Sequence, residues 1–276
     1  SLRSLLALRS GLTTPPAAAI TARLGVQPDI EPAKLRAINT EASAGGFTVN
    51  TGEALLPAQM SQLVAESTPG TPAELSIVES DPKLTALSTM ATGAGALTDG
   101  ERMFVSMFGM QRNTYRQQPG LRIRDAEAIP DLLDANPRRI IWVDGDLTLD
   151  TDVGSASDPV LLIVNGDSLT LTAGVTITGF VYVRGTLPAT ANTACIRPTA
   201  MVATDCVATV TLPNAITNIK GALVTEGALR TVYASTPAST NELIVTYDRT
   251  VLDTLRHNYG SWVRVGGGWR DFKGTP

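Results

Sequence analysis

The sequence predicts a mainly β protein, and within that class a β-solenoid (β-helix) built from coils of about 20 residues. The first observation is a repeated pattern, in which an apolar run ends in Gly at residues 140–145, 161–166, 180–185 and 222–227. The second is spacing: the four glycines lie 21, 19 and 42 positions apart, and 42 is twice 21. A recurring unit of this length is typical of stacked β coils.

The third observation is the alternation of apolar residues before each Gly. Alternate side chains of a strand share a face, so the residues four and two positions before each Gly should point inward together. These pairs are Ile141 and Val143, Leu162 and Val164, Val181 and Val183, and Leu223 and Thr225. An antiparallel sandwich is the alternative fold, because short strands with frequent turns also fit it.

The chain divides into four regions. We expect an irregular N-terminal α/β region at 1–97, a capping helix at 98–118, the β-solenoid at 119–234 with a Cys-containing insert at 186–215, and a C-terminal helix and aromatic tail at 235–276. Within the first region the sequence predicts a helix at the very start, a short helix over 31–39, and strands at 47–52 and 74–78.

Two helices have clear signals. The first begins with a capping box at 98–101 and carries an apolar stripe at helical spacing, formed by Met103, Phe104, Met107, Phe108 and Tyr115. We expect this stripe to cover the open end of the solenoid, and a partner-binding face is the alternative. The second helix runs from Asp248 to Tyr259 with Gly260 as its C′ residue.

Composition argues against several functions. The chain has 276 residues, 17% of them charged, and a net charge of −4, so nucleic acid is an unlikely partner. There is one histidine, His257, which fits a surface or C-capping position in the second helix. The chain contains neither a nucleophile elbow nor a phosphate-binding loop. We therefore expect no enzyme activity and no cofactor.

The two cysteines, Cys195 and Cys206, lie 11 positions apart inside the insert. In an oxidising compartment they would close a small loop as a disulfide, which stabilises a fold by roughly 2–3 kcal/mol. Two thiols and one distant histidine are too few for a metal site.

An acidic cluster consists of Asp144, Asp146, Asp150 and Asp152. Carboxylates at alternate strand positions share a face, so these residues are a candidate calcium site or a candidate for sugar cleavage. Aspartate beside glycine is also common in turns, where it bonds its own backbone. We favour turns, and expect no metal.

Several segments resemble the PilX-type pilus-assembly proteins of bacterial type IV pili. They are Met103-Phe104-Val105-Ser106-Met107-Phe108-Gly109-Met110, Tyr115, Gln118-Pro119, Ile141-Trp142-Val143-Asp144-Gly145-Asp146-Leu147-Thr148-Leu149, Tyr247-Asp248 and Trp269-Arg270-Asp271-Phe272. The resemblance covers about residues 98–272, with Gly266-Gly267-Gly268 where the family usually has Pro-Gly-Ser.

The resemblance implies a non-enzymatic, minor pilin-like component that helps prime or cap the pilus. It implies pilins and pilus tip or adhesin proteins as partners, a membrane-anchored full-length protein, and a place in the pilus or on the periplasmic side of the inner membrane. The alternative function is a solenoid protein that binds or cleaves polysaccharide. The tail contains Trp262, Trp269 and Phe272, and we favour a fold back onto the second helix as a clasp. In the alternative, Trp269 and Phe272 are exposed subunit contacts.

Overall fold

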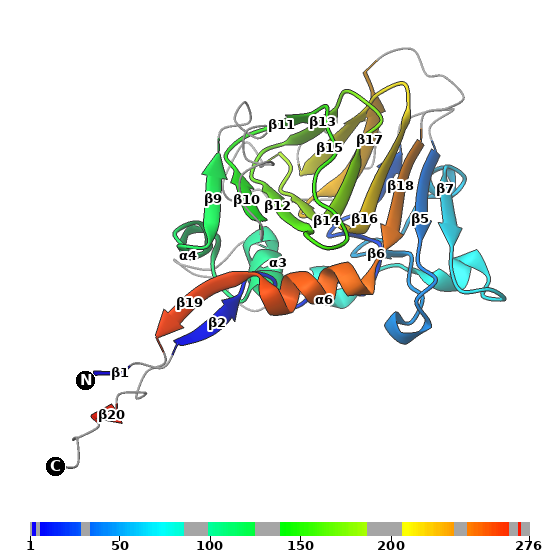
Figure 1. The fold of residues 1–276 in the computed structure, drawn as a ribbon. Coiled ribbons are helices and arrows are strands. Elements are labelled where there is room, and N and C mark those ends of the chain that lie inside the picture. The colour runs from blue at the N-terminus through cyan, green and yellow to red at the C-terminus, as the bar shows by residue number, and fades with distance from the viewer. Residues whose placement is uncertain are drawn as a thin grey trace.

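Two parallel β-sheets that face each other form the body of the protein (Figure 1). The computed structural model describes residues 2–3, 6–28, 34–85, 99–124, 139–186, 206–234, 242–264 and 270–271. Cys195, Trp269 and Phe272 lie outside these residues, as does most of the predicted insert.

The larger sheet has 11 strands, all of them parallel. Its main path runs in the order β7 (Leu63–Glu66), β5 (Lys34–Ile38), β18 (Glu242–Tyr247), β16 (Ile216–Thr225), β14 (Thr176–Val183), β12 (Val160–Val164), β10 (Arg139–Val143) and β9 (Leu121–Arg124). The sheet forks at β16. The first part of β16 pairs with β18, and its last three residues pair with β3 (Ile20–Ala22), which leads to β6 (Val49–Thr51) and β8 (Ile77–Val78).

The smaller sheet has five parallel strands. They are β11 (Leu147–Leu149), β13 (Ser168–Leu171), β15 (Val207–Leu212), β17 (Ala228–Tyr233) and β4 (Val26–Pro28), in that order. Leucine and valine at alternate positions of these strands are buried and join the core of the larger sheet. The core therefore lies between the two sheets.

The predicted inward residues do share one core. Ile141, Leu162, Val181 and Leu223 are in register across four neighbouring strands, and Val143, Val164 and Val183 form the next row. All seven are at most 1% exposed and belong to one hydrophobic cluster. The alternation rule thus correctly grouped these seven residues, although the side chains between them are buried as well.

The predicted β-solenoid, however, is wrong. Successive coils of a solenoid would stack in chain order, whereas here the residues before 97 supply strands to both sheets and extend the larger one beyond β16. The structure is mainly β with parallel sheets. The repeat in the sequence accounts only for strands between β10 and β17, because the N-terminal strands do not follow its spacing of about 20 residues, although Gly52 directly follows β6.

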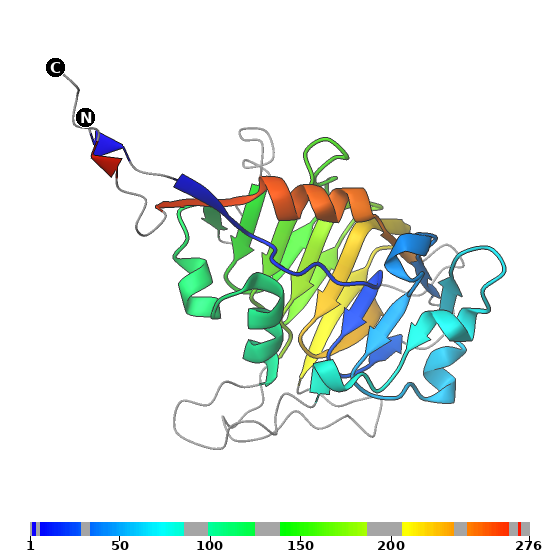
Figure 2. The same ribbon diagram turned by 90° about the horizontal axis from the view of Figure 1, so that it is seen from below.

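The outer face of the larger sheet is covered by helices (Figure 2). α3 (Asp99–Phe108) and α4 (Arg112–Arg116) replace the single helix expected at 98–118, because the chain turns at Gly109 with φ 74°. The expected stripe is buried. It contacts the sheet face through Phe104 and Phe108, and so does not cap the end of a solenoid.

The second helix is confirmed as α6 (Arg249–Asn258). Asp248 caps it by accepting a hydrogen bond from the backbone of Val251, and Val251, Leu252 and Leu255 are buried. The shorter helical turns are η1 (Ala42–Ala44), α1 (Pro57–Met60), η2 (Ala73–Ser76) and α2 (Pro82–Thr85). Among the described residues, none of the helices has both the length and the apolar character needed to span a membrane.

The first and last described segments form a two-stranded ribbon that leaves the body (Figures 1 and 2). β2 (Leu6–Ser10) pairs antiparallel with β19 (Gly260–Arg264), and β1 (Leu2–Arg3) pairs antiparallel with β20 (Arg270–Asp271) at its tip. The expected helix at the start is therefore wrong, as is the one at 31–39, where β5 forms instead. The described part of the tail runs outward with the ribbon, and Trp269, which the clasp would place against α6, lies outside the described residues.

Candidate functional site

A row of polar residues runs along the carboxyl edge of the larger sheet. Each of five neighbouring strands is followed directly by one of them: Asp144 after β10, Asn165 after β12, Arg184 after β14, Glu226 after β16 and Arg23 after β3. The last residues of these strands are in register from Val143 to Ala22. We call these five residues the polar row.

The local sequence explains why the row is so regular. Four of its members directly precede a glycine of the repeat, at 145, 166, 185 and 227. A Cβ at Gly166 would lie 2.2 Å from the carbonyl of Gly145, so only glycine lets the turns approach this closely. The chain turns at these glycines, and the polar residue before each one is left at the end of its strand.

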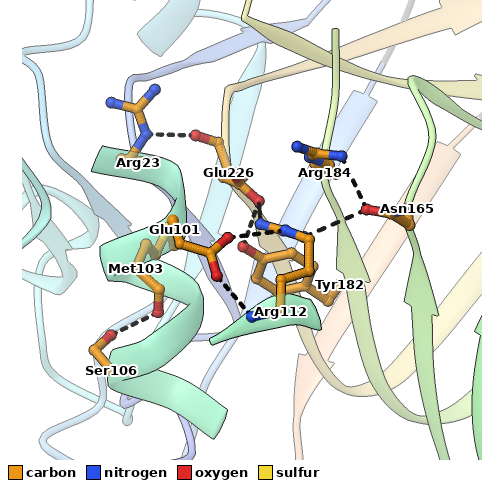
Figure 3. A network of polar contacts seen from close by, with 9 residues as sticks. All are labelled: Arg23, Glu101, Met103, Ser106, Arg112, Asn165, Tyr182, Arg184 and Glu226. Carbon is orange, nitrogen blue, oxygen red and sulfur yellow. Dashed lines mark hydrogen bonds and ion pairs between the residues drawn. The ribbon is translucent and has the colours of Figure 1, made fainter. Parts of the chain in front are cut away.

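Arg112 of α4 inserts its guanidinium into the middle of the row (Figure 3). Nη2 donates to Glu226 Oε2 at 2.5 Å, and Nε donates to Glu101 Oε2 at 3.1 Å. Nη1 reaches Asn165 Oδ1 at 3.5 Å, and the guanidinium carbon lies 4.5 Å from the centroid of the Phe104 ring. Burial is the largest single effect on Arg112 and lowers its pKa, but Glu226, Tyr182 and Glu101 together outweigh it and raise the pKa above its usual value.

Glu226 is the carboxylate at the centre of this network. It is 7% exposed, and its Oε2 also accepts a hydrogen bond from the hydroxyl of Tyr182 at 2.8 Å. Its backbone carbonyl accepts from Nε of Arg23 at 2.6 Å. Burial, together with the charge of Glu226, raises the pKa of Tyr182 well above its usual value, so this tyrosine stays protonated and donates. Gly100 of α3 packs against Glu226, and a Cβ there would overlap the carboxylate.

Arg184 lies between these groups and is only half-buried. Its Nη1 donates to Asn165 Oδ1 at 3.2 Å, while its buried Nε has no hydrogen-bond partner among the described residues. Burial, and then the neighbouring positive charge of Arg112, lower the pKa of Arg184 from its usual value. Two guanidinium groups, those of Arg112 and Arg184, therefore lie close together in the middle of the row.

A second ion pair joins α4 to the end of the row. Arg116 donates to Asp144 through Nη2 at 2.5 Å and Nε at 3.1 Å, and the indole of Trp142 donates to Asp144 Oδ1 at 2.8 Å. The hydrogen bonds from Arg116 lower the pKa of Asp144 despite partial burial. We call the contacts of Arg112 and Arg116 with the polar row the helix clamp.

Aromatic rings fill the space beneath the helix clamp. The Phe104 ring centroid lies 5.6 Å from that of Tyr182, 5.5 Å from that of Tyr115 and 6.1 Å from that of Trp142, in edge-to-face geometry. All four residues are at most 1% exposed. Such pairs add to the energy of apolar burial, so the clamp and the rings together fix α3 and α4 on the sheet.

The predicted acidic cluster does not converge on one point. Asp144 belongs to the helix clamp, Asp146 accepts from the backbone N–H groups of residues 167 and 168, and Asp152 accepts from the backbone of residue 176. Asp150 is exposed. Within the described ranges, no three His, Cys, Asp or Glu side chains gather closely enough to hold a metal ion. The backbone groups that Asp146 and Asp152 bind lie 21 to 24 residues away, so these hydrogen bonds join neighbouring turns and are not the bonds to the residue's own backbone that the turn interpretation describes.

The remaining predicted residues are less informative. His257 is exposed in the last turn of α6, where Nδ1 lies 2.8 Å from the carbonyl of Asp253, as expected for a C-capping histidine. Cys206 is buried, but Cys195 lies outside the described residues, so the disulfide stays a prediction. The subunit contacts of Trp269 and Phe272 stay predictions for the same reason.

The sequence analysis missed the central residues of the site, which are Arg112, Glu226, Tyr182, Arg184, Arg23 and Glu101. The available signal was a polar residue before each repeat glycine. Comparison of the chain with protein-family models, curated proteins and solved structures finds no match. The functional argument therefore depends on the geometry of the site and of the molecule.

Proposed function

We propose that this protein is a non-enzymatic, minor pilin-like component of bacterial type IV pili, which helps prime or cap pilus assembly and presents a rigid β body. On this proposal it acts in the pilus or on the periplasmic side of the inner membrane, and its partners are pilins and pilus tip or adhesin proteins. Its function is mechanical and recognitional.

One observation carries the proposal. Two of the segments that resemble pilus-assembly proteins, 103–110 and 141–149, pack against each other. Phe104 and Tyr115 both contact Trp142, with ring centroids 6.1 and 6.3 Å apart, and Trp142 bonds Asp144 of the clamp. Two parts of the resemblance that are distant in the sequence thus lie side by side in the structure.

The ion pairs between α4 and the polar row support a structural role for the site. Arg112, Glu101 and Glu226 bond one another, and Arg116 bonds Asp144, so these ionic groups are engaged in holding α4 to the sheet. Buried ion pairs of this kind fix an arrangement rather than add much net stability. A fixed helix pair suits a protein that presents a constant surface to its partners.

A gene deletion tests the proposal. In the bacterium that encodes the protein, deletion should reduce surface pili in electron micrographs, and the wild-type gene should restore them. A gene carrying Arg249→Ala, which removes only an exposed ion pair, should restore them equally well, whereas Arg112→Ala should restore fewer. The protein should also be found in sheared pili.

Unchanged pili in the deletion strain, together with absence of the protein from sheared pili, would contradict the proposal. The alternative is tested with the purified chain and acidic polysaccharides. New reducing ends or unsaturated sugar ends would identify a polysaccharide-cleaving protein, and retention on immobilised polysaccharide would identify a binding protein.

A further inference from the structure

The ribbon of β2 and β19 exposes an apolar surface away from the body. Residues directly opposite each other in an antiparallel pair share a face, so Leu6, Leu8 and Trp262 lie on one face. Trp262 is 63% exposed and Leu6 is 50% exposed, while Val263 on the other face is 37% exposed. Large apolar side chains are therefore open to solvent on both faces of a two-stranded ribbon.

The same ribbon is basic, in contrast to the rest of the chain. Its four strands contain Arg3, Arg9, Arg264 and Arg270 and one acidic residue, Asp271, so their formal charge is +3. The whole chain carries −4, so all other residues together carry −7. The positive charge is concentrated at one end of an acidic molecule.

The two ends of the ribbon contribute to the same charge. Arg3 and Arg270 are partners in the register of β1 and β20, so segments from both ends of the described chain bring basic residues to the tip.

We propose that the ribbon binds the surface of an anionic lipid bilayer, with Trp262 and Leu6 in the headgroup region and the arginines at lipid phosphates. Tryptophan prefers the membrane interface, and arginine reaches phosphate groups while its stem stays in apolar surroundings. A bilayer can accept apolar side chains from both faces of a narrow ribbon, whereas a rigid protein groove covers one. An acidic protein is the competing partner.

This inference rests on the proposed function and extends it: the ribbon would hold the β body at a membrane surface, where it can meet its partners. The vesicle experiment uses only purified protein and lipid, so its result does not depend on pilus assembly. Vesicle binding can fail while the deletion strain still loses pili, and binding can occur in a protein that has no effect on pili. The two proposals can therefore be rejected separately.

The test is cosedimentation of the full chain with vesicles of phosphatidylglycerol and phosphatidylcholine in equal parts, compared with phosphatidylcholine alone. Binding should need phosphatidylglycerol and weaken with added salt. Each basic residue near an anionic surface contributes about a fivefold factor in the binding constant, so Arg3→Gln with Arg270→Gln should weaken binding about 30-fold. Trp262→Ala should also weaken it.

Two matched controls change exposed residues on the body. Leu75 is 70% exposed and Arg249 lies in α6, so Leu75→Ala and Arg249→Gln should bind vesicles like the wild type. Circular dichroism checks that every variant is folded. Absence of binding to phosphatidylglycerol vesicles, or equal binding by Trp262→Ala, would overturn the inference. Equally tight binding of soluble polyglutamate, unaffected by Trp262→Ala, would assign the ribbon to acidic proteins and would overturn it too.

Discussion

Replacing Arg112 with alanine should destabilise the protein by about 3–4 kcal/mol, because the carboxylate of Glu226 stays buried without its guanidinium partner. Removing one member of a buried ion pair costs about 3–5 kcal/mol. The hydroxyl of Tyr182 still donates to Glu226 at 2.8 Å, which favours the lower end of that range. Loss of the contact with the Phe104 ring, at 4.5 Å, adds a smaller amount.

Urea unfolding with linear extrapolation measures this cost, and an unchanged dependence on urea shows that the unfolding transition is the same. Arg249→Ala is the matched control, since Arg249 is also a helical arginine in an ion pair but its side chain is 49% exposed. It should cost at most about 0.5 kcal/mol. Combining Arg112→Met with Glu226→Leu should cost less than Arg112→Ala alone, because no unpaired carboxylate is left at position 226. Equal costs for Arg112→Ala and Arg249→Ala would refute the reasoning.

Three further predictions concern the core, a titrating aspartate and the cysteines. Val164→Asp should destabilise the fold by about 3 kcal/mol or more, because Val164 is fully buried, and an unchanged melting temperature would contradict its inward register. The pKa of Asp144 is lowered in the folded state, so its contribution is present above its unfolded pKa of about 3.9 and is lost as pH falls through the folded pKa. The stability difference between wild type and Asp144→Asn should therefore stay constant above about pH 5 and shrink in acid; a difference that persists unchanged in acid would argue against this titration, and Asp150→Asn serves as the exposed control. Mass spectrometry of unreduced peptides from exported protein should find Cys195 bonded to Cys206, and two free thiols would disprove this pairing.

The alternation of apolar residues along the strands predicted the packing of one face of the larger sheet. The inward residues Ile141, Leu162 and Val181 were identified from their position before a repeat glycine. The outward residues between them, such as Trp142 and Tyr182, are also buried, because helices cover the outer face. Strands that are apolar on both faces are typical of covered parallel sheets, and this signal was present in the sequence.

The β-solenoid was predicted wrongly because the sequence repeat gives no information about the N-terminal strands, which lie outside it. β3, β6 and β8 are two or three residues long and lie outside the regular glycine spacing, and β5 forms in a stretch whose sequence also fits a short helix. Their places depend on pairing with β16 and β18, which lie more than 150 residues later in the chain. Such long-range pairing leaves no local signature.

The candidate site was missed for a related reason. Its residues before the repeat glycines are an aspartate, an asparagine, an arginine and a glutamate, so they share a position but not a chemistry. They become one site only when parallel register aligns the strand ends and Arg112 enters from α4. Arg112 itself lay in a predicted helix, with no sequence feature to separate it from a solvent-exposed arginine.

The antiparallel ribbon also determines how the molecule would respond to a pulling force. β2 and β19 leave the body side by side and in opposite chain directions. A force that draws the two strands apart would break their hydrogen bonds one pair at a time, which takes little force. A force applied to both strands together, along the ribbon, would instead pass into the body, through Leu12 on one side and α6 on the other. Attachment through this end alone would therefore load the buried core and leave the ribbon intact.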